Sequence, residues 1–177
     1  GHDDEDDREG AREESHQGED RLIVPSPKVS TYDLQPEMAV VELTKRVLDR
    51  ISSNVYSFIL INFANADMVA HTGNIPAATR ACELIDQCVK DVVDAVLALD
   101  GTCMITADHG NVEEMIGPNG ETDTEHSTYP VPLIVISKAF ASYPAELPQG
   151  KLGDIAPTAL ALLGIPIPKE MTGTNLL

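Results

Sequence analysis

Five side chains with metal-binding chemistry occur in three short segments of this 177-residue sequence. Asp67 and His71 are four residues apart, and one helical turn would place both on one face. Asp108 and His109 are adjacent, and His126 follows in a segment rich in Thr and Ser. Carboxylate oxygens and imidazole nitrogens suit divalent ions such as Mn²⁺, Zn²⁺, Fe²⁺ or Co²⁺. Five ligands exceed what one open site usually takes, so the sequence predicts two metal ions, which together could clamp a phosphoryl group.

Each of these segments also has a simpler interpretation when taken alone. Asp67 and His71 could form an ordinary surface pair, and His126 could be a solvated loop residue. Asp108 could cap a turn through its side chain. The position of these residues next to expected strand ends favours a metal site, because ligands in open α/β sheets bind beyond the carboxyl ends of the strands.

Apolar patterning predicts the elements that position these side chains. Nearly continuous apolar runs predict buried strands at 56–64, 102–107 and 131–137, with a shorter strand at 22–24. Apolar residues at helical spacing predict helices over 36–53 and 76–98, and a last helix that begins near Asp154 and stops at Gly164. Strands that alternate with helices predict an α/β fold with a mainly parallel sheet flanked by helices.

The charge of the chain is negative and unevenly distributed. The net charge is −17, and residues 1–20 carry ten acidic side chains against two Arg. We therefore expect a disordered acidic tail at 1–20 and one folded domain at 21–177. The acidic balance argues against nucleic acid or an anionic membrane as a partner. It does not exclude a phosphorylated small molecule, because a bound metal reverses the local field.

Composition also bears on the cellular compartment. The three Cys form no CxxC pair and lie in apolar surroundings, as expected of core residues in a reducing compartment. No apolar run reaches the roughly 18 residues of a membrane span, and no secretory signal is visible. These features predict a cytoplasmic protein, and they indicate no oligomeric state.

Longer segments resemble one known family, the cofactor-independent phosphoglycerate mutases. The motifs that carry this resemblance are ordered along the chain and extend almost to its end: 24–38 (VPSPKVSTYDLQPEM), 65–73 (NADMVAHTG), 106–111 (TADHGN), 154–158 (DIAPT) and 168–173 (PKEMTG). Together they cover most of residues 21–177, and a fainter similarity reaches back to about Gly10.

The resemblance implies an alkaline-phosphatase-like fold and a specific reaction. The family interconverts 3-phosphoglycerate and 2-phosphoglycerate in glycolysis and gluconeogenesis, through a phosphoserine intermediate and with two metal ions, commonly Mn²⁺. By resemblance, Asp67, His71 and His126 match the ligands of one metal. Asp108 and His109 match ligands of the other.

The resemblance is also partial. The family's nucleophilic Ser, the domain that holds the sugar acid and a metal-proximal Lys have no counterpart in this sequence. We therefore expect a domain incomplete at its N-terminal side, with no catalytic nucleophile and no cofactor site besides the metals. The chain should bind phosphoglycerate only if the missing parts are supplied, and should be inactive alone. Two alternatives are a non-catalytic metal-binding remnant and another metal-dependent phosphatase or phosphomutase of the same superfamily.

Overall fold

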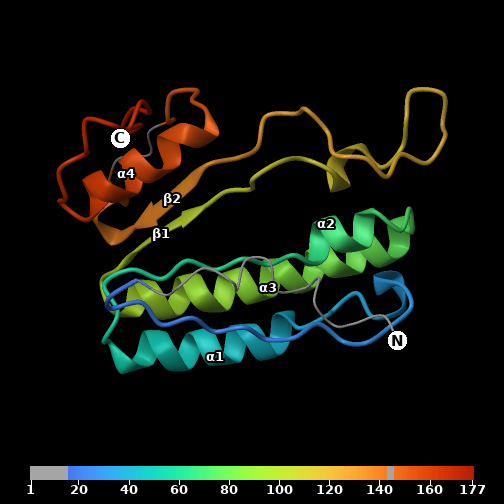
Figure 1. The fold of residues 1–177 in the computed structure, drawn as a ribbon, viewed down its shortest axis with the longest axis horizontal. Coiled ribbons are helices and arrows are strands. Elements are labelled where there is room, and N and C mark those ends of the chain that lie inside the picture. The colour runs from blue at the N-terminus through green and yellow to red at the C-terminus, as the bar shows by residue number, and fades with distance from the viewer. Residues whose placement is uncertain (1–15, 143–145) are drawn as a thin grey trace.

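The computed structural model describes residues 16–142 and 146–177, so most of the predicted acidic tail lies outside the described residues. Two long helices, α1 (Val40–Ser53) and α3 (Ile75–Ala98), pack against each other. In Figure 1, α3 lies between α1 and a strand pair formed by β1 (Thr102–Ile105) and β2 (Ile134–Ser137). The helices predicted at 36–53 and 76–98 are confirmed, although α1 begins four residues later than predicted.

A short helix, α2 (Asn65–Ala70), folds back on the first turns of α3. Val69 and Ala70 are fully buried against small side chains of α3, among them Ala78 and Ala81. Small residues allow the two helix backbones to approach closely, and Met115 closes the cluster. The packing of one side of α2 against α3 therefore fixes the direction in which the opposite side of α2 faces.

Local sequence explains where α3 begins. The Asn74 side chain accepts a hydrogen bond from the Ala77 amide at 3.2 Å, and Pro76 occupies the first turn. Asn74 Nδ2 also donates to Asp33 Oδ2 at 3.1 Å. The start of α3 is thereby tied to the segment before α1.

The sheet differs from the prediction of a mainly parallel arrangement. In the described part of the chain, β1 and β2 form a two-stranded antiparallel pair, in register from Thr102 with Ser137 to Ile105 with Ile134. A parallel pair needs a crossover connection, usually a helix. The connection from 106 to 133 contains only the short 3-10 helix η3 (Val112–Glu114), so the chain returns antiparallel.

Two further predicted strands are not formed. Residues 56–64 run extended from α1 to α2 without a strand partner among the described residues. Residues 22–24 also have no strand partner in the described part of the chain. The prediction that 56–64 is buried on both faces is wrong, since Leu60 is 85% exposed and Phe58 is also exposed. A strand exists only when a neighbour accepts its backbone hydrogen bonds, and the local sequence does not supply that neighbour.

The C-terminal region is built around α4 (Ile155–Leu162), which confirms the last predicted helix. The preceding Asp154 is buried, and its carboxylate accepts hydrogen bonds from the amides of Lys151 and Thr174, each at 2.8 Å. Buried Thr158 accepts from the Leu176 amide at 3.1 Å. Side chains at the start of α4 therefore anchor the chain end. None of the helices in 16–142 and 146–177 has the length and apolar character to cross a membrane.

Candidate metal centre

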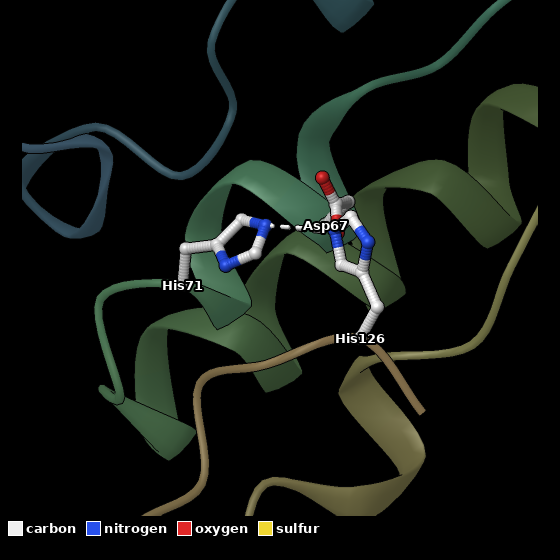
Figure 2. Close-up of side chains that lie close together, drawn as sticks. All are labelled: Asp67, His71 and His126. Carbon is white, nitrogen blue, oxygen red and sulfur yellow. Dashed lines mark hydrogen bonds and ion pairs between the residues drawn. The ribbon is translucent and has the colours of Figure 1, made fainter. Parts of the chain in front are cut away.

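Asp67, His71 and His126 converge on one point (Figure 2). The Nε2 atoms of the two histidines are 3.1 Å apart, and Asp67 Oδ1 is 3.3 Å from each of them. Atoms bound to one ion at about 2.0–2.2 Å lie about 2.8–3.6 Å from one another in tetrahedral or octahedral geometry. The triangle thus has the dimensions of one face of a metal coordination sphere.

A hydrogen bond fixes which nitrogen of His71 is available. His71 Nδ1 lies 2.6 Å from the Thr124 carbonyl oxygen, which can only accept, so the proton is assigned to Nδ1. His71 Nε2 then faces Asp67 Oδ1 at 3.3 Å, and each of these atoms can offer a lone pair. Two facing acceptors repel unless a cation lies between them, so the donor set fits a metal ion.

The fold brings His71 to Thr124 through the turn between α2 and α3. Gly73 has φ +72°, which favours glycine, and a Cβ atom there would lie 2.7 Å from Thr122 Cγ2. The loop that carries Thr122 and Thr124 therefore packs directly on this turn. Asp67 lies inside α2 and the His71 amide donates to its carbonyl at 3.1 Å, so both side chains share one face as the spacing predicted.

Asn111 is a further member of the site that the sequence interpretation did not select. Its Nδ2 donates to Asp67 Oδ1 at 2.7 Å and lies 3.5 Å from His71 Nε2. The residue is 4% exposed, and its Oδ1 is buried without a hydrogen-bond partner in the described part of the chain. A buried amide that donates to Asp67 Oδ1 would hold the Asp67 carboxylate in one orientation.

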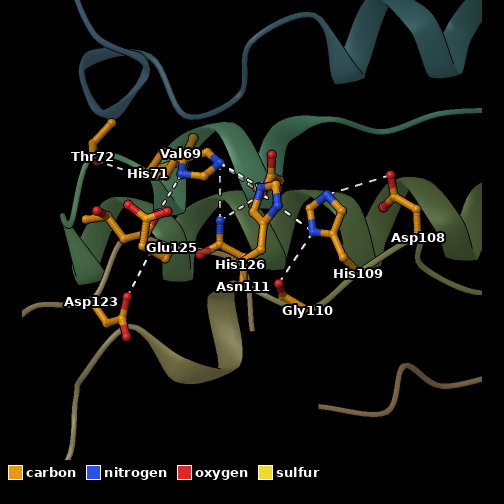
Figure 3. Close-up of polar contacts among 12 residues, drawn as sticks. Val69, His71, Thr72, Asp108, His109, Gly110, Asn111, Asp123, Glu125 and His126 are labelled. Atoms are coloured by element: carbon orange, nitrogen blue, oxygen red, sulfur yellow. Dashed lines mark hydrogen bonds and ion pairs between the residues drawn. The ribbon is translucent and has the colours of Figure 1, made fainter. Parts of the chain in front are cut away.

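The other predicted pair lies beside this triangle (Figure 3). The His109 ring stacks on the His126 ring, with centroids 3.7 Å apart and planes inclined by 21°. Asp108 Oδ2 lies 3.7 Å from His109 Nε2, and the Asp108 side chain is 89% exposed. Asp108 and His109 could supply two ligands to a second ion, and an ion there would need further ligands.

Comparison with known proteins gives the chain a family. The profile of the metalloenzyme superfamily matches residues 7–167. The chain belongs to the metalloenzyme superfamily.

Several relatives of this metalloenzyme chain carry the same name. The chain is 52% identical over 168 residues to the 2,3-bisphosphoglycerate-independent phosphoglycerate mutase of Serratia proteamaculans. It is 51% identical over 170 residues to the enzyme of that name from Clostridium botulinum, and 49% identical over 169 residues to the one from Clostridioides difficile. These matches cover 94–95% of the chain, which spans about a third of the relatives' length (32–33%). The predicted resemblance is confirmed.

A solved structure agrees with the fold of this metalloenzyme chain. It superposes on a Leishmania mexicana phosphoglycerate mutase, crystallised at low cobalt concentration, with a TM-score of 0.71 and 27% identity. The superposition covers 85% of the chain and 30% of the Leishmania protein. The α/β, alkaline-phosphatase-like fold class is therefore confirmed, even though its described sheet is small and antiparallel.

The predicted ligands of this metalloenzyme chain thus separate into a convergent group and a neighbouring pair. Asp67, His71 and His126 offer ligand atoms that all lie within 4.8 Å of one another. Asp108 and His109 are adjacent to that group but do not belong to it. The assignment of all five residues as metal ligands, and the number of ions, stay predictions. The Thr124 carbonyl was missed because a backbone group gives no sequence signal.

Proposed function

We propose that this chain is the metal-binding portion of a cofactor-independent phosphoglycerate mutase. It would hold two divalent ions that take part in interconverting 3-phosphoglycerate and 2-phosphoglycerate. The convergence of Asp67, His71 and His126, at 3.1–3.3 Å from one another, carries the proposal. The names of the relatives supply the reaction. The proposal implies a role in glycolysis and gluconeogenesis in the cytoplasm.

The chain's own residues have distinct tasks in this proposal. Asp67 Oδ1 and the Nε2 atoms of His71 and His126 bind the first ion, and Asp108 and His109 contribute to the second. Asn111 keeps the Asp67 carboxylate oriented by donating to it. A divalent ion bound here supplies positive charge that stabilises phosphoryl oxygens as charge develops on them.

The donor set narrows the choice of metal. One carboxylate oxygen and two imidazole nitrogens favour Mn²⁺, Zn²⁺, Fe²⁺ or Co²⁺ over Ca²⁺ or Mg²⁺, which prefer all-oxygen ligands. We propose Mn²⁺, on the family resemblance. The cobalt in the Leishmania mexicana crystals is compatible with the same donor set.

We propose that the chain has no mutase activity alone. The family's nucleophilic Ser and the domain that binds the sugar acid have no counterpart in this sequence, and loss of one reacting group removes most of an enzyme's rate advantage. The test is complementation. The two thirds of the Clostridium botulinum enzyme that this chain does not match would be co-expressed with it, and interconversion of the two phosphoglycerates followed by phosphorus NMR.

Three outcomes separate the proposal from its alternatives. Interconversion by the mixture but by neither part alone supports it, and the Asp67→Ala chain should then fail in the mixture. Metal binding without complementation indicates a non-catalytic remnant. Turnover of phosphoglycerate, or hydrolysis of a general phosphomonoester, by the chain alone contradicts the proposal, and hydrolysis indicates a phosphatase of the same superfamily.

A further inference from the structure

Glu113 lies at the junction of the two loops that carry three of the proposed ligands. Its Oε2 accepts a hydrogen bond from the Asn111 amide at 2.9 Å, and its Oε1 accepts one from the Ser127 hydroxyl. Asn111 follows Asp108 and His109 closely in sequence, and Ser127 follows His126 directly. The Glu113 carboxylate therefore bridges the loop that carries Asp108 and His109 to the loop that carries His126.

A backbone contact lies at the same junction. The Ser127 amide donates to the Gly110 carbonyl at 2.8 Å, and the two residues form an isolated antiparallel bridge. A Cβ atom on Gly110 would overlap both Glu113 Oε1 and Ser127 Oγ, so the junction requires glycine at this position. The hydrogen bond from Ser127 lowers the pKa of the Glu113 carboxyl, and the group is thus an ionised acceptor at neutral pH.

We propose that Glu113 is a positioning residue of the metal centre: it clasps the 108–111 loop to the 126–127 loop and so sets where His126 meets Asp67 and His71. This inference rests on the proposed metal centre. Glu113 is not a proposed ligand, because its two oxygens accept from the Asn111 amide and the Ser127 hydroxyl. It acts through Asn111, which donates to Asp67 Oδ1, and through Ser127, the neighbour of His126.

The loops are held by hydrogen-bond geometry in this proposal, and the negative charge itself is not required. Glu113→Gln keeps the shape, since its amide oxygen can accept from the Asn111 amide and its amide NH2 group can donate to the Ser127 hydroxyl oxygen. Glu113→Ala removes both contacts. Glu114→Ala is the matched control, because Glu114 is the next residue in η3 and its hydrogen bond to the 108–111 loop, from its amide to the Asn111 carbonyl at 3.0 Å, is a backbone contact that alanine keeps.

The first measurement is hydrogen exchange of the Asn111 and Ser127 amides in the full, metal-free chain, followed by NMR. Glu113→Ala should accelerate exchange at both amides, and Glu113→Gln and Glu114→Ala should leave it close to that of the unmodified chain. Ser127→Ala should accelerate exchange less than Glu113→Ala, since Asn111 keeps its acceptor. Unchanged exchange in Glu113→Ala would overturn the clasp.

The second measurement is Co²⁺ titration followed by the visible absorption spectrum, which reports coordination geometry. We expect Glu113→Ala to weaken Co²⁺ binding by about 10–100-fold and to change the spectrum, as loss of outer-sphere partners does at other metal sites. Glu113→Gln should restore both. Equal weakening in Gln and Ala variants would assign the effect to charge and overturn the inference. If the unmodified chain binds no Co²⁺, the proposed metal centre fails and this inference with it; normal binding by Glu113→Ala sinks this inference alone.

Discussion

His109 stacks on His126, with the ring centroids 3.7 Å apart, although the family resemblance assigns the two histidines to different metal ions. One ring face of His126 is therefore covered by His109, while its Nε2 edge faces Asp67 and His71. Stacking restricts rotation of the His126 ring. The two proposed sites are therefore in direct contact through these two rings.

This stacking predicts that His109 affects a site it does not ligate. His109→Ala should weaken metal binding at the triangle by about tenfold, because His126 loses the ring that orients it. His109→Phe keeps a flat ring there and should retain the triangle's affinity while removing a ligand of the second site. Calorimetric titration with Mn²⁺ measures both variants. Equal loss in Phe and Ala variants would show that the His109 nitrogens matter to the triangle, and not the stacked ring.

Metal removal should destabilise the fold. At a free Mn²⁺ concentration 100 times the dissociation constant, binding to the native state alone contributes about 2.7 kcal/mol. For a chain of this length that corresponds to an increase in Tm of roughly 5–10 °C. Differential scanning calorimetry with Mn²⁺ and with chelator provides the comparison. The Asp67→Ala chain is the control and should show one midpoint in both conditions; equal midpoints in the unmodified chain contradict the prediction.

Asp154 should make stability dependent on acid pH. The amides of Thr174 and Lys151 hold the pKa of its carboxyl below the ordinary 3.8. A depressed native pKa stabilises the fold at any pH above the unfolded-state pKa, and this contribution is lost as pH falls through the native value. Asp154→Asn should lower stability at neutral pH and flatten the decline below about pH 4. Urea unfolding at several pH values tests this; an unchanged acid slope would count against it.

Thr158 should be important to stability through its hydroxyl group. Thr158→Val keeps the shape of this fully buried side chain but leaves the Leu176 amide without its acceptor, and we expect a loss of about 1–3 kcal/mol in unfolding free energy. Thr79→Val is the matched control, because the Thr79 hydroxyl bonds to Ile75 on the exposed side of α3, and it should change stability by less than about 0.5 kcal/mol. Similar losses in both variants would refute a specific role for Thr158.

The extended segment 56–64 should promote self-association, because it exposes apolar side chains and has no strand partner in the described structure. Leu60→Lys places a charge at the most exposed of these side chains and should shift the chain toward monomer in sedimentation velocity. Val41→Lys adds the same charge on α1 and should shift it less. An unmodified chain that is monomeric at all concentrations would remove the basis of this prediction.

Local sequence was sufficient for the three helices predicted at 36–53, at 76–98 and after Asp154, whereas the short helix α2 was not predicted as an element. Asn74 with Pro76 specified the start of α3, and Gly164 at φ +67° lies just past the end of α4 as predicted. Local sequence also placed β1 and β2, which lie within the predicted strands at 102–107 and 131–137. It was insufficient for their pairing direction, which depends on the connection between them, and for 56–64, which has the composition of a strand without a described partner.

The part of the site that depends on local sequence was also predictable. The spacing of Asp67 and His71 predicted a shared helix face, since four residues make one turn. The approach of His126 depends on a loop that folds onto Gly73, and no local pattern encodes that contact. Asn111 lies two residues after His109 in the sequence. An asparagine that orients a carboxylate resembles any other loop asparagine until the structure shows its amide next to Asp67.

The centre joins segments that are far apart along the chain: Asn111 is 44 residues from Asp67, and His126 is 55 residues from His71. Contacts of such long sequence separation are slow to form, since the intervening chain must first be ordered. The α2–α3 hairpin is assembled from near neighbours and should fold early, with the ligand triangle closing late. An ion that binds only the closed triangle would then act mainly on the unfolding rate, prolonging the lifetime of the native state more than it speeds its formation.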